Sequence, residues 1–151
     1  MPGGNNNLLS LVRGLEGSGA TAVSPAGARG TYQIMPGTAR QYGGDPAKLF
    51  DPAYNEALAK VILEDLRSKN NTLAEVLVAY NAGQRTAERF RAAGDNTGIL
   101  PMETQKYLQH AERMGANLRA NVSITLENKT GSSAVFAAKQ AGIAWSPGVG
   151  Q

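Results

Sequence analysis

One carboxyl group stands apart in the first part of this sequence. Glu16 is the only acidic residue among the first 44 positions, and it falls where an apolar run from Leu8 to Leu15 meets a glycine-rich segment. Burial among apolar and neutral neighbours penalises the charged form, so we expect the pKa of this carboxyl group to be raised. A carboxyl group that keeps its proton is suited to general acid catalysis, which makes Glu16 the first candidate catalytic residue.

The chain has few residues that could form other kinds of catalytic site. There is no cysteine, which excludes disulfides, thiol nucleophiles and thiolate metal sites. His110 is the only histidine, and we expect it to be a partly exposed helix residue rather than a metal ligand or a triad base. No nucleophile elbow or phosphate-binding glycine loop occurs. What remains is carboxylic acid catalysis on a bond whose leaving group needs protonation, such as a glycoside, with no metal or cofactor.

Length and charge limit the number of domains and the kinds of partner that this chain could have. With 151 residues the chain can bury the core of one domain. Its net charge of +3 is spread along the sequence, which does not favour nucleic acid as a partner and would suit a polyanionic cell wall. No stretch approaches the roughly 20 apolar residues of a membrane span, and residues 1–7 do not read as a signal peptide. We therefore expect an intracellular protein, one delivered by another device, or a fragment of a longer polypeptide.

The elements that must position Glu16 read mainly as helices. Apolar residues recur at helical spacing from Leu8 to Leu15, after asparagines 5–7 that offer an N-cap, so Glu16 falls at the C-terminal end of this helix. Asp51 before Pro52 marks a second helix start, and the segment 72–75 matches a capping box. The predicted helices cover residues 8–16, 36–42, 52 onward, 73–81, 85–93 and a longer segment after Pro101. The buried face of that last helix is expected to hold Tyr107, Ala111, Met114 and Leu118.

The end of the chain has a different pattern. Val122, Ile124 and Leu126 alternate with polar residues, which predicts a short strand, and residues 134–138 could complete a hairpin. The sequence thus predicts a flexible N-terminus at 1–7, a mainly α-helical domain at 8–120 and a short β-rich tail at 121–151. An exposed strand edge in this tail would be free to pair, with a second copy or with another protein, unless it packs on its own domain.

Three blocks in order resemble the soluble lytic transglycosylase family, which has the goose-type lysozyme fold. They are Glu16, residues 24–39 (SPAGARGTYQIMPGTA) and residues 79–83 (AYNAG). A fourth block, residues 100–107 (LPMETQKY), is similar to the family's Pro-x-Glu-Thr-x-x-Tyr segment. The similarity covers about residues 8–118, and it implies a lysozyme-like helical fold and cleavage of peptidoglycan glycan strands.

The resemblance also implies a mechanism. Glu16 would protonate the glycosidic oxygen between N-acetylmuramic acid and N-acetylglucosamine, then take the proton of the muramoyl C6 hydroxyl as that oxygen attacks C1 and closes a 1,6-anhydro ring. One carboxyl group would serve both steps. Tyr80 would hydrogen-bond Glu16 or a substrate acetamide, and Met35 would supply an apolar wall. The residues implied to contact substrate are Ser24, Gln33, Met35, Tyr80, Asn81 and Glu103.

Some of these residues also have plain structural interpretations. Ser24 before Pro25 is typical of a turn, and Glu103 in the first turn of a helix favours the helix dipole without any substrate. The sequence departs from the family pattern at two places. Gly17 stands directly after Glu16 where the family commonly has Ser, and Tyr32 with its neighbour replaces Leu-Met, which would put a larger, polar-tipped ring near the cleft.

Two other functions stay open at this point. A muramidase would pair Glu16 with a second carboxylate that activates water, for which the nearest candidates in sequence are Asp45, Asp51 and Glu56. A non-catalytic glycan-binding module would keep the fold and lose the acid. The lack of a leader, the wall-cutting domain and the tail together suggest a lysin carried to the periplasmic wall by a phage virion. A bacterial envelope enzyme expressed without its leader is the alternative.

Overall fold

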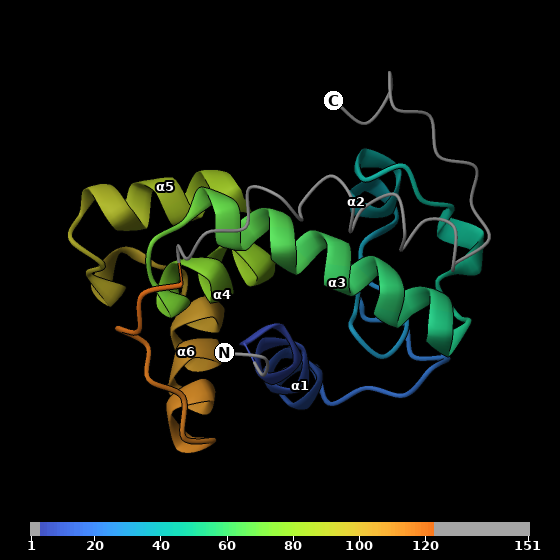
Figure 1. Cartoon of the computed structure of the whole chain (residues 1–151), viewed down its shortest axis with the longest axis horizontal. Coiled ribbons are helices and arrows are strands. Elements are labelled where there is room, and N and C mark those ends of the chain that lie inside the picture. The colour runs from blue at the N-terminus through green and yellow to red at the C-terminus, as the bar shows by residue number, and fades with distance from the viewer. Residues whose placement is uncertain (1–3, 123–151) are drawn as a thin grey trace. The chain divides into compact units, whose positions relative to one another are not determined.

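The computed structural model describes residues 4–122, which are mainly α-helical, as predicted (Figure 1). The elements are α1 (Gly4–Glu16), α2 (Pro36–Gln41), the short 3-10 helix η1 (Pro46–Lys48), α3 (Pro52–Lys69), α4 (Leu73–Ala82), α5 (Gln84–Ala92), the 3-10 helix η2 (Thr97–Ile99) and α6 (Met102–Arg113). The strand and hairpin expected beyond Val122 lie outside the described residues. The described chain divides into two compact units, residues 4–62 and 63–122, with the boundary inside α3.

Two of the predicted helix starts are capped as expected. The Asp51 carboxylate accepts the Ala53 N–H at 3.0 Å at the start of α3, and the Thr72 hydroxyl accepts the Glu75 N–H at 3.2 Å at the start of α4. The start of α1 differs from the prediction. It begins at Gly4, so the asparagine run lies inside the helix rather than before it as a cap.

In the first unit, one face of α1 is buried through Leu8, Val12 and Leu15. These residues recur at the spacing that puts them on one side of a helix, as the sequence indicated. Further core residues come from α3, where Tyr54 and Leu58 are buried. The apolar side of α1 is therefore held in the core, and the helix carries Glu16 at its end.

In the second unit, α4 packs against both α5 and α6 (Figure 1). The face that α6 buries was only partly predicted. Ala111 is buried as expected, but its companions are Thr104 and Leu108, while Met114 is 43% exposed. The helix ends at Arg113, so Met114 and the residues after it do not continue its face.

The segment 118–122 runs beside the start of α4. The Leu73 N–H donates to the Ala120 carbonyl at 2.9 Å and the Ala74 N–H to the Leu118 carbonyl at 3.0 Å. These are first-turn donors that have no partner inside their own helix. The Val122 N–H donates in turn to the Asn71 carbonyl at 2.9 Å, so this segment is tied to the second unit as far as Val122.

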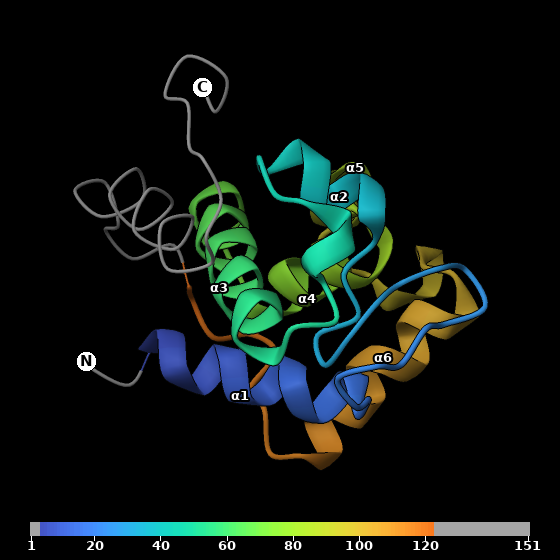
Figure 2. The same ribbon diagram turned by 90° about the vertical axis from the view of Figure 1, so that its right-hand side faces the viewer.

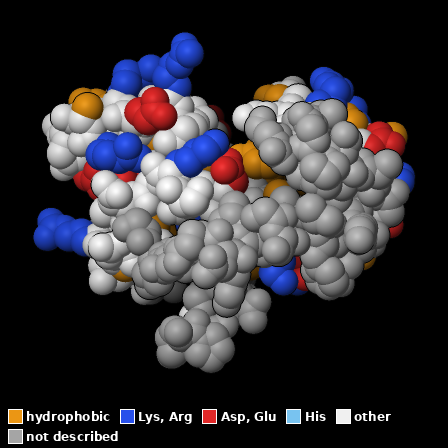
Figure 3. Space-filling model, turned by 45° about the horizontal axis from the view of Figure 1, so that its top comes forward, with side chains coloured by type: hydrophobic (Ala, Val, Ile, Leu, Met, Phe, Trp, Pro, Cys, Tyr) orange, Lys and Arg blue, Asp and Glu red, His pale blue; other side chains and the backbone are white. Residues whose placement is uncertain are grey.

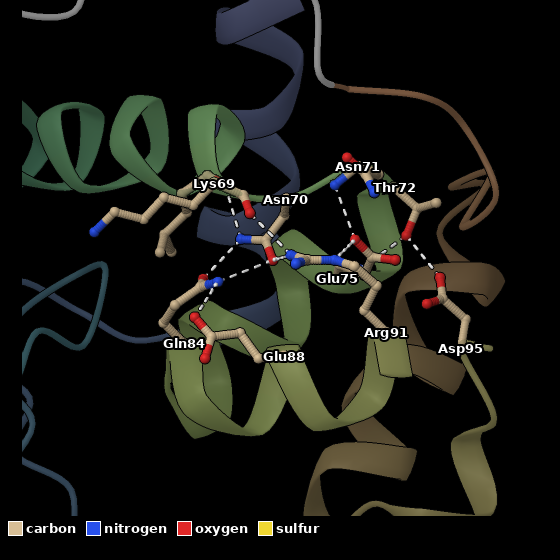
Figure 4. A network of polar contacts seen from close by, with 10 residues as sticks. Lys69, Asn70, Asn71, Thr72, Glu75, Gln84, Glu88, Arg91 and Asp95 are labelled. Atoms are coloured by element: carbon tan, nitrogen blue, oxygen red, sulfur yellow. Dashed lines mark hydrogen bonds and ion pairs between the residues drawn. The ribbon is translucent and has the colours of Figure 1, made fainter. Parts of the chain in front are cut away.

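Arg91 is the centre of a polar network in the second unit (Figure 4). Its guanidinium donates to the Glu75 carboxylate at 3.1 Å, to the Asn70 side-chain oxygen at 2.6 Å and to the Lys69 carbonyl at 2.8 Å. The Asn70 amide donates further to Gln84 at 2.8 Å. Glu75 is only 3% exposed, so this charge is compensated by a cation and hydrogen bonds, which a buried carboxylate requires.

Asp95 forms a carboxyl pair with Glu75 at the edge of this network. Burial, together with a hydrogen bond to Glu75, raises the pKa of Asp95 to about 6. Burial also acts to raise the pKa of Glu75, but hydrogen bonds from Asp95, the Asn71 N–H and Arg91 outweigh it and hold that pKa below its ordinary value. The two carboxyl groups therefore share one proton up to about pH 6.

We expect Asp95→Asn to stabilise the protein at neutral pH. The folded-state pKa of Asp95, about 6, lies above its ordinary value of 3.8, so the folded protein holds a proton that the unfolded chain releases between these values. The free energy of unfolding thus loses this contribution as the pH rises through that range. Asparagine cannot ionise, still accepts from Thr72, and tolerates the positive φ of 59° at this position.

Urea unfolding of both proteins over a series of pH values measures this effect. The stability difference in favour of Asp95→Asn should grow from about pH 4 to about pH 6 and stay constant above that range. A difference that does not change with pH would contradict the shared proton.

Candidate active site

Glu16 is the last residue of α1 and is half-buried. Gly17 follows it in the left-handed region, with φ of 58°, and its N–H donates to the Arg13 carbonyl at 3.0 Å. The Ser18 hydroxyl donates to the Glu16 carbonyl at 3.0 Å. Glycine adopts this conformation without the cost a side chain brings. The departure from Ser at position 17 therefore coincides with a left-handed helix end that fixes the backbone beside the acid.

The loop after α1 is folded on itself by short antiparallel pairings (Figure 2). Arg29 pairs with Val23 on one side and with Ile34 on the other. Its N–H donates to the Ile34 carbonyl at 2.9 Å, and the Gly30 N–H donates to the Ala22 carbonyl at 2.9 Å. This arrangement brings the segment around Ser24 and the segment around Gln33 to the same small folded loop.

Ser24 holds a turn inside that loop. Its hydroxyl oxygen accepts the Ala28 N–H at 2.9 Å, and its carbonyl accepts the Gly27 N–H at 2.9 Å. The turn that the sequence offered as the plain interpretation is therefore present. The acceptor side of the hydroxyl serves this turn while its hydrogen can still donate, so contact between Ser24 and a sugar stays a prediction.

Gln33 adopts a left-handed backbone conformation, with φ of 51°. Its side-chain nitrogen donates to the Gly30 carbonyl at 2.8 Å and more weakly to the Ala22 carbonyl at 3.4 Å. Within residues 4–122 its amide oxygen accepts no hydrogen bond. The loop thus fixes the orientation of this amide and leaves its oxygen as the group that could accept from a sugar hydroxyl or N–H.

Met35 is placed for a role on the surface rather than in the core. It is 40% exposed and precedes α2 as its N-cap residue. A large apolar side chain with this exposure can supply the wall that the sequence predicted, although its contact with substrate stays a prediction.

Asn55 is a residue that the sequence analysis missed. It lies on α3 with no exposed surface. Its side-chain nitrogen donates to the Arg29 carbonyl at 3.0 Å and the Leu49 carbonyl at 2.9 Å, and its oxygen accepts the Tyr32 N–H at 2.8 Å. This amide therefore clamps the loop that carries Gln33. Its position one turn after Asp51 gave no signal, because helical spacing does not mark a polar residue as buried.

The Tyr32 ring is only 2% exposed and belongs to the core. Its place beside the cleft stays a prediction. Burial raises the pKa of its hydroxyl, the negative charge of Glu56 adds to this, and the positive charge of Arg13 opposes it. Asn55 holds the Tyr32 N–H, and the side chain of the next residue, Gln33, donates to the Gly30 carbonyl of the same loop.

The second unit carries Tyr80 and Asn81 in the last turn of α4, and both are half-buried. The Thr104 hydroxyl donates to the Asn81 side-chain oxygen at 2.9 Å. This bond brings the end of α4 together with the first turn of α6, where Glu103 is exposed beside Thr104. Glu103 occupies a position that favours the helix dipole, so its contact with sugar stays a prediction, as does the contact of Tyr80 with Glu16.

Two of the three carboxylates considered as a second catalytic group accept hydrogen bonds at helix starts. Asp45 accepts the Ala47 N–H at 2.9 Å at the start of η1, and Asp51 caps α3. Glu56 is exposed on α3. Two of the three are therefore used to begin helices.

The remaining surface features are plain. His110 is exposed on α6, as predicted. Among residues 4–122, no His, Asp and Glu side chains form a group of three that could hold a metal ion, and none of the described helices combines the length and apolar character needed to cross a bilayer. Lys and Arg side chains, with Asp and Glu side chains among them, are visible on the face drawn in Figure 3.

A family model described as the transglycosylase SLT domain matches residues 7–100 of the chain. The match includes Glu16, the loop with Ser24 and Gln33, and the end of α4 with Tyr80 and Asn81. It stops just before α6. No solved structure matches the chain.

Proposed function

The chain belongs to the transglycosylase SLT domain family, and from this membership we propose how its residues cleave the glycan. Members of this family are lytic transglycosylases that act on peptidoglycan, and this is the activity of the chain. We propose that the bond cleaved is the β-1,4 bond from N-acetylmuramic acid to N-acetylglucosamine, and that Glu16 acts first as general acid and then as general base. The position of Glu16 supports this, because it is half-buried at a fixed helix end.

In this mechanism the proton of Glu16 passes to the oxygen that joins C1 of the muramoyl residue to N-acetylglucosamine, and the bond between C1 and this oxygen breaks. The C6 hydroxyl oxygen of the muramoyl residue then forms a bond to C1 and returns its proton to the Glu16 carboxylate. The reaction needs neither water nor a second carboxyl group, because one C1–O bond replaces another and Glu16 ends with its proton. The use of Asp45 and Asp51 as helix caps disfavours hydrolysis in which either of them activates water.

Several side chains are proposed to bind sugar. The orientation of the Gln33 amide supports a role as acceptor, and the exposure of Met35 supports a role as apolar wall. The remaining proposed contacts are made by Ser24, Tyr80, Asn81 and Glu103.

Release of fragments without new reducing ends tests this function. A 1,6-anhydro ring has no free hemiacetal, so purified peptidoglycan should clear while the reducing-sugar signal stays at its starting level. A hen-type muramidase digest of the same material, matched for the extent of clearing, supplies the control with rising reducing ends. An equal rise with this protein would favour the muramidase alternative, and no clearing at all would favour a non-catalytic glycan-binding module.

We further propose that the protein acts locally on the periplasmic wall and that a phage particle carries it there. The substrate supports the first part, because peptidoglycan forms the wall. The second part is supported only by the alternating pattern at residues 122–126, which would offer an edge for attachment. If purified phage particles do not contain this protein, the phage proposal is wrong and the bacterial envelope enzyme is the remaining alternative.

A further inference from the structure

Thr104 makes an unusual use of its hydroxyl group. A threonine inside a helix commonly donates to a carbonyl one turn earlier in the same helix. Here the carbonyls of Leu100 and Pro101 already accept from Gln105, at 2.9 Å and 3.0 Å. The Thr104 hydroxyl donates instead across to the Asn81 side-chain oxygen at 2.9 Å, and Thr104 is only 2% exposed.

This bond decides which end of the Asn81 amide is available. The two ends of an asparagine amide have almost the same shape, but one accepts hydrogen bonds and the other donates them. With the oxygen held by Thr104, the nitrogen is the end left to other partners, and within the described part of the chain it has none. Turning the amide over would make the Asn81 nitrogen donate to the Thr104 oxygen, and the buried hydroxyl hydrogen would then need another acceptor. The carbonyls within its reach, those of Leu100 and Pro101, already accept from Gln105, so the orientation with the Asn81 oxygen toward Thr104 is favoured.

We infer that Thr104 is a positioning residue for glycan binding: its buried hydroxyl orients the Asn81 amide so that N–H groups, rather than the oxygen, face an acceptor oxygen of the sugar. The inference rests on the proposed role of Asn81 in binding sugar. It deepens that role by naming the chemistry that Asn81 recognises and the residue that sets it.

Two substitutions separate the hydroxyl from the methyl group of Thr104. Thr104→Val keeps the shape and removes the hydroxyl, whereas Thr104→Ser keeps the hydroxyl and leaves a small cavity. We expect Thr104→Val to raise the KM for soluble glycan strands about tenfold with little change in kcat, the effect of one lost oriented hydrogen bond. Thr104→Ser should keep the wild-type KM although its urea midpoint is lower.

The same measurement in an Asn81→Ala background tests whether Thr104 acts through Asn81. Asn81→Ala alone should raise KM, and adding Thr104→Val should raise it no further. A wild-type KM in Thr104→Val would overturn the inference. The inference would also be overturned if the activity losses of Thr104→Val and Thr104→Ser were proportional to their losses of stability. It would be overturned as well if Thr104→Val raised KM in the Asn81→Ala background by the same factor as in the wild-type protein.

The outcomes also separate this inference from the proposed function. If the wild-type protein cleaves glycan without new reducing ends and Asn81→Ala raises KM, but Thr104→Val does not, only the positioning role fails. If Asn81→Ala leaves KM unchanged, the sugar-binding role of Asn81 fails and this inference fails with it. If the wild-type protein releases new reducing ends, the proposed mechanism fails, while the KM comparison still tests Thr104.

Discussion

Glu16→Gln should reduce peptidoglycan cleavage by at least about a hundredfold, the lower end of the effect of general acid–base catalysis. Glutamine has nearly the same shape but can neither donate the proton to the leaving oxygen nor recover one from the C6 hydroxyl. The substituted residue remains at the end of α1, where the Gly17 N–H donates to the Arg13 carbonyl and the Ser18 hydroxyl donates to the backbone carbonyl of residue 16. The fold should therefore be retained, as judged by the urea midpoint, while clearing of purified peptidoglycan is lost.

Glu56→Gln is the matched control, because it makes the same chemical change at an exposed glutamate in the same unit. It should clear peptidoglycan at the wild-type rate. Near wild-type activity in Glu16→Gln would remove Glu16 from the mechanism. Loss of activity in both variants would instead indicate a hydrolase in which Glu56 is the second carboxyl group.

Gly30→Ala should be the most destabilising single methyl addition in the loop. A Cβ at this position would lie 2.5 Å from both the Leu49 carbonyl oxygen and the Asn55 side-chain nitrogen, and φ is 82°. Overpacking costs about 1–3 kcal/mol and the left-handed conformation about 1–2 kcal/mol. We expect the free energy of unfolding to fall by about 2–5 kcal/mol, with glycan cleavage impaired because the Gln33 segment is displaced.

Gly27→Ala separates the two causes. Gly27 has φ of 100° in the same loop, but nothing lies within 4 Å of the added Cβ. Gly27→Ala should lower the free energy of unfolding only by the cost of the left-handed backbone conformation, about 1–2 kcal/mol. Urea unfolding of the two variants measures the difference, and equal losses would show that the close approach to Asn55 contributes nothing.

Local signals in the sequence were sufficient for most helix positions. Asp51 and Thr72 cap the helices that they were expected to begin, because capping depends on groups only two or three residues apart. Glu16 lies at the C-terminal end of α1 for the same reason, since the apolar spacing before it and the glycine after it are both local. The family blocks then identified the segments that carry the proposed site.

The features that the sequence did not reveal depend on contacts between distant residues. Asn55 reaches back to the Arg29 carbonyl and the Tyr32 N–H, and Thr104 reaches Asn81. A polar residue at helical spacing looks the same whether it faces water or a buried partner. Tyr32 is likewise buried in a segment held by Asn55, which is distant in sequence, so its burial could not be read from the residue type.

The mass of the products formed in heavy-oxygen water tests the central claim most directly. Peptidoglycan digested by the wild-type protein in that solvent should give muropeptides that are one water lighter than the muramidase products and carry no solvent oxygen, because the C6 hydroxyl of the sugar replaces water as nucleophile. Products that carry one heavy oxygen for each bond cleaved would contradict this account and show that Glu16 serves a hydrolase.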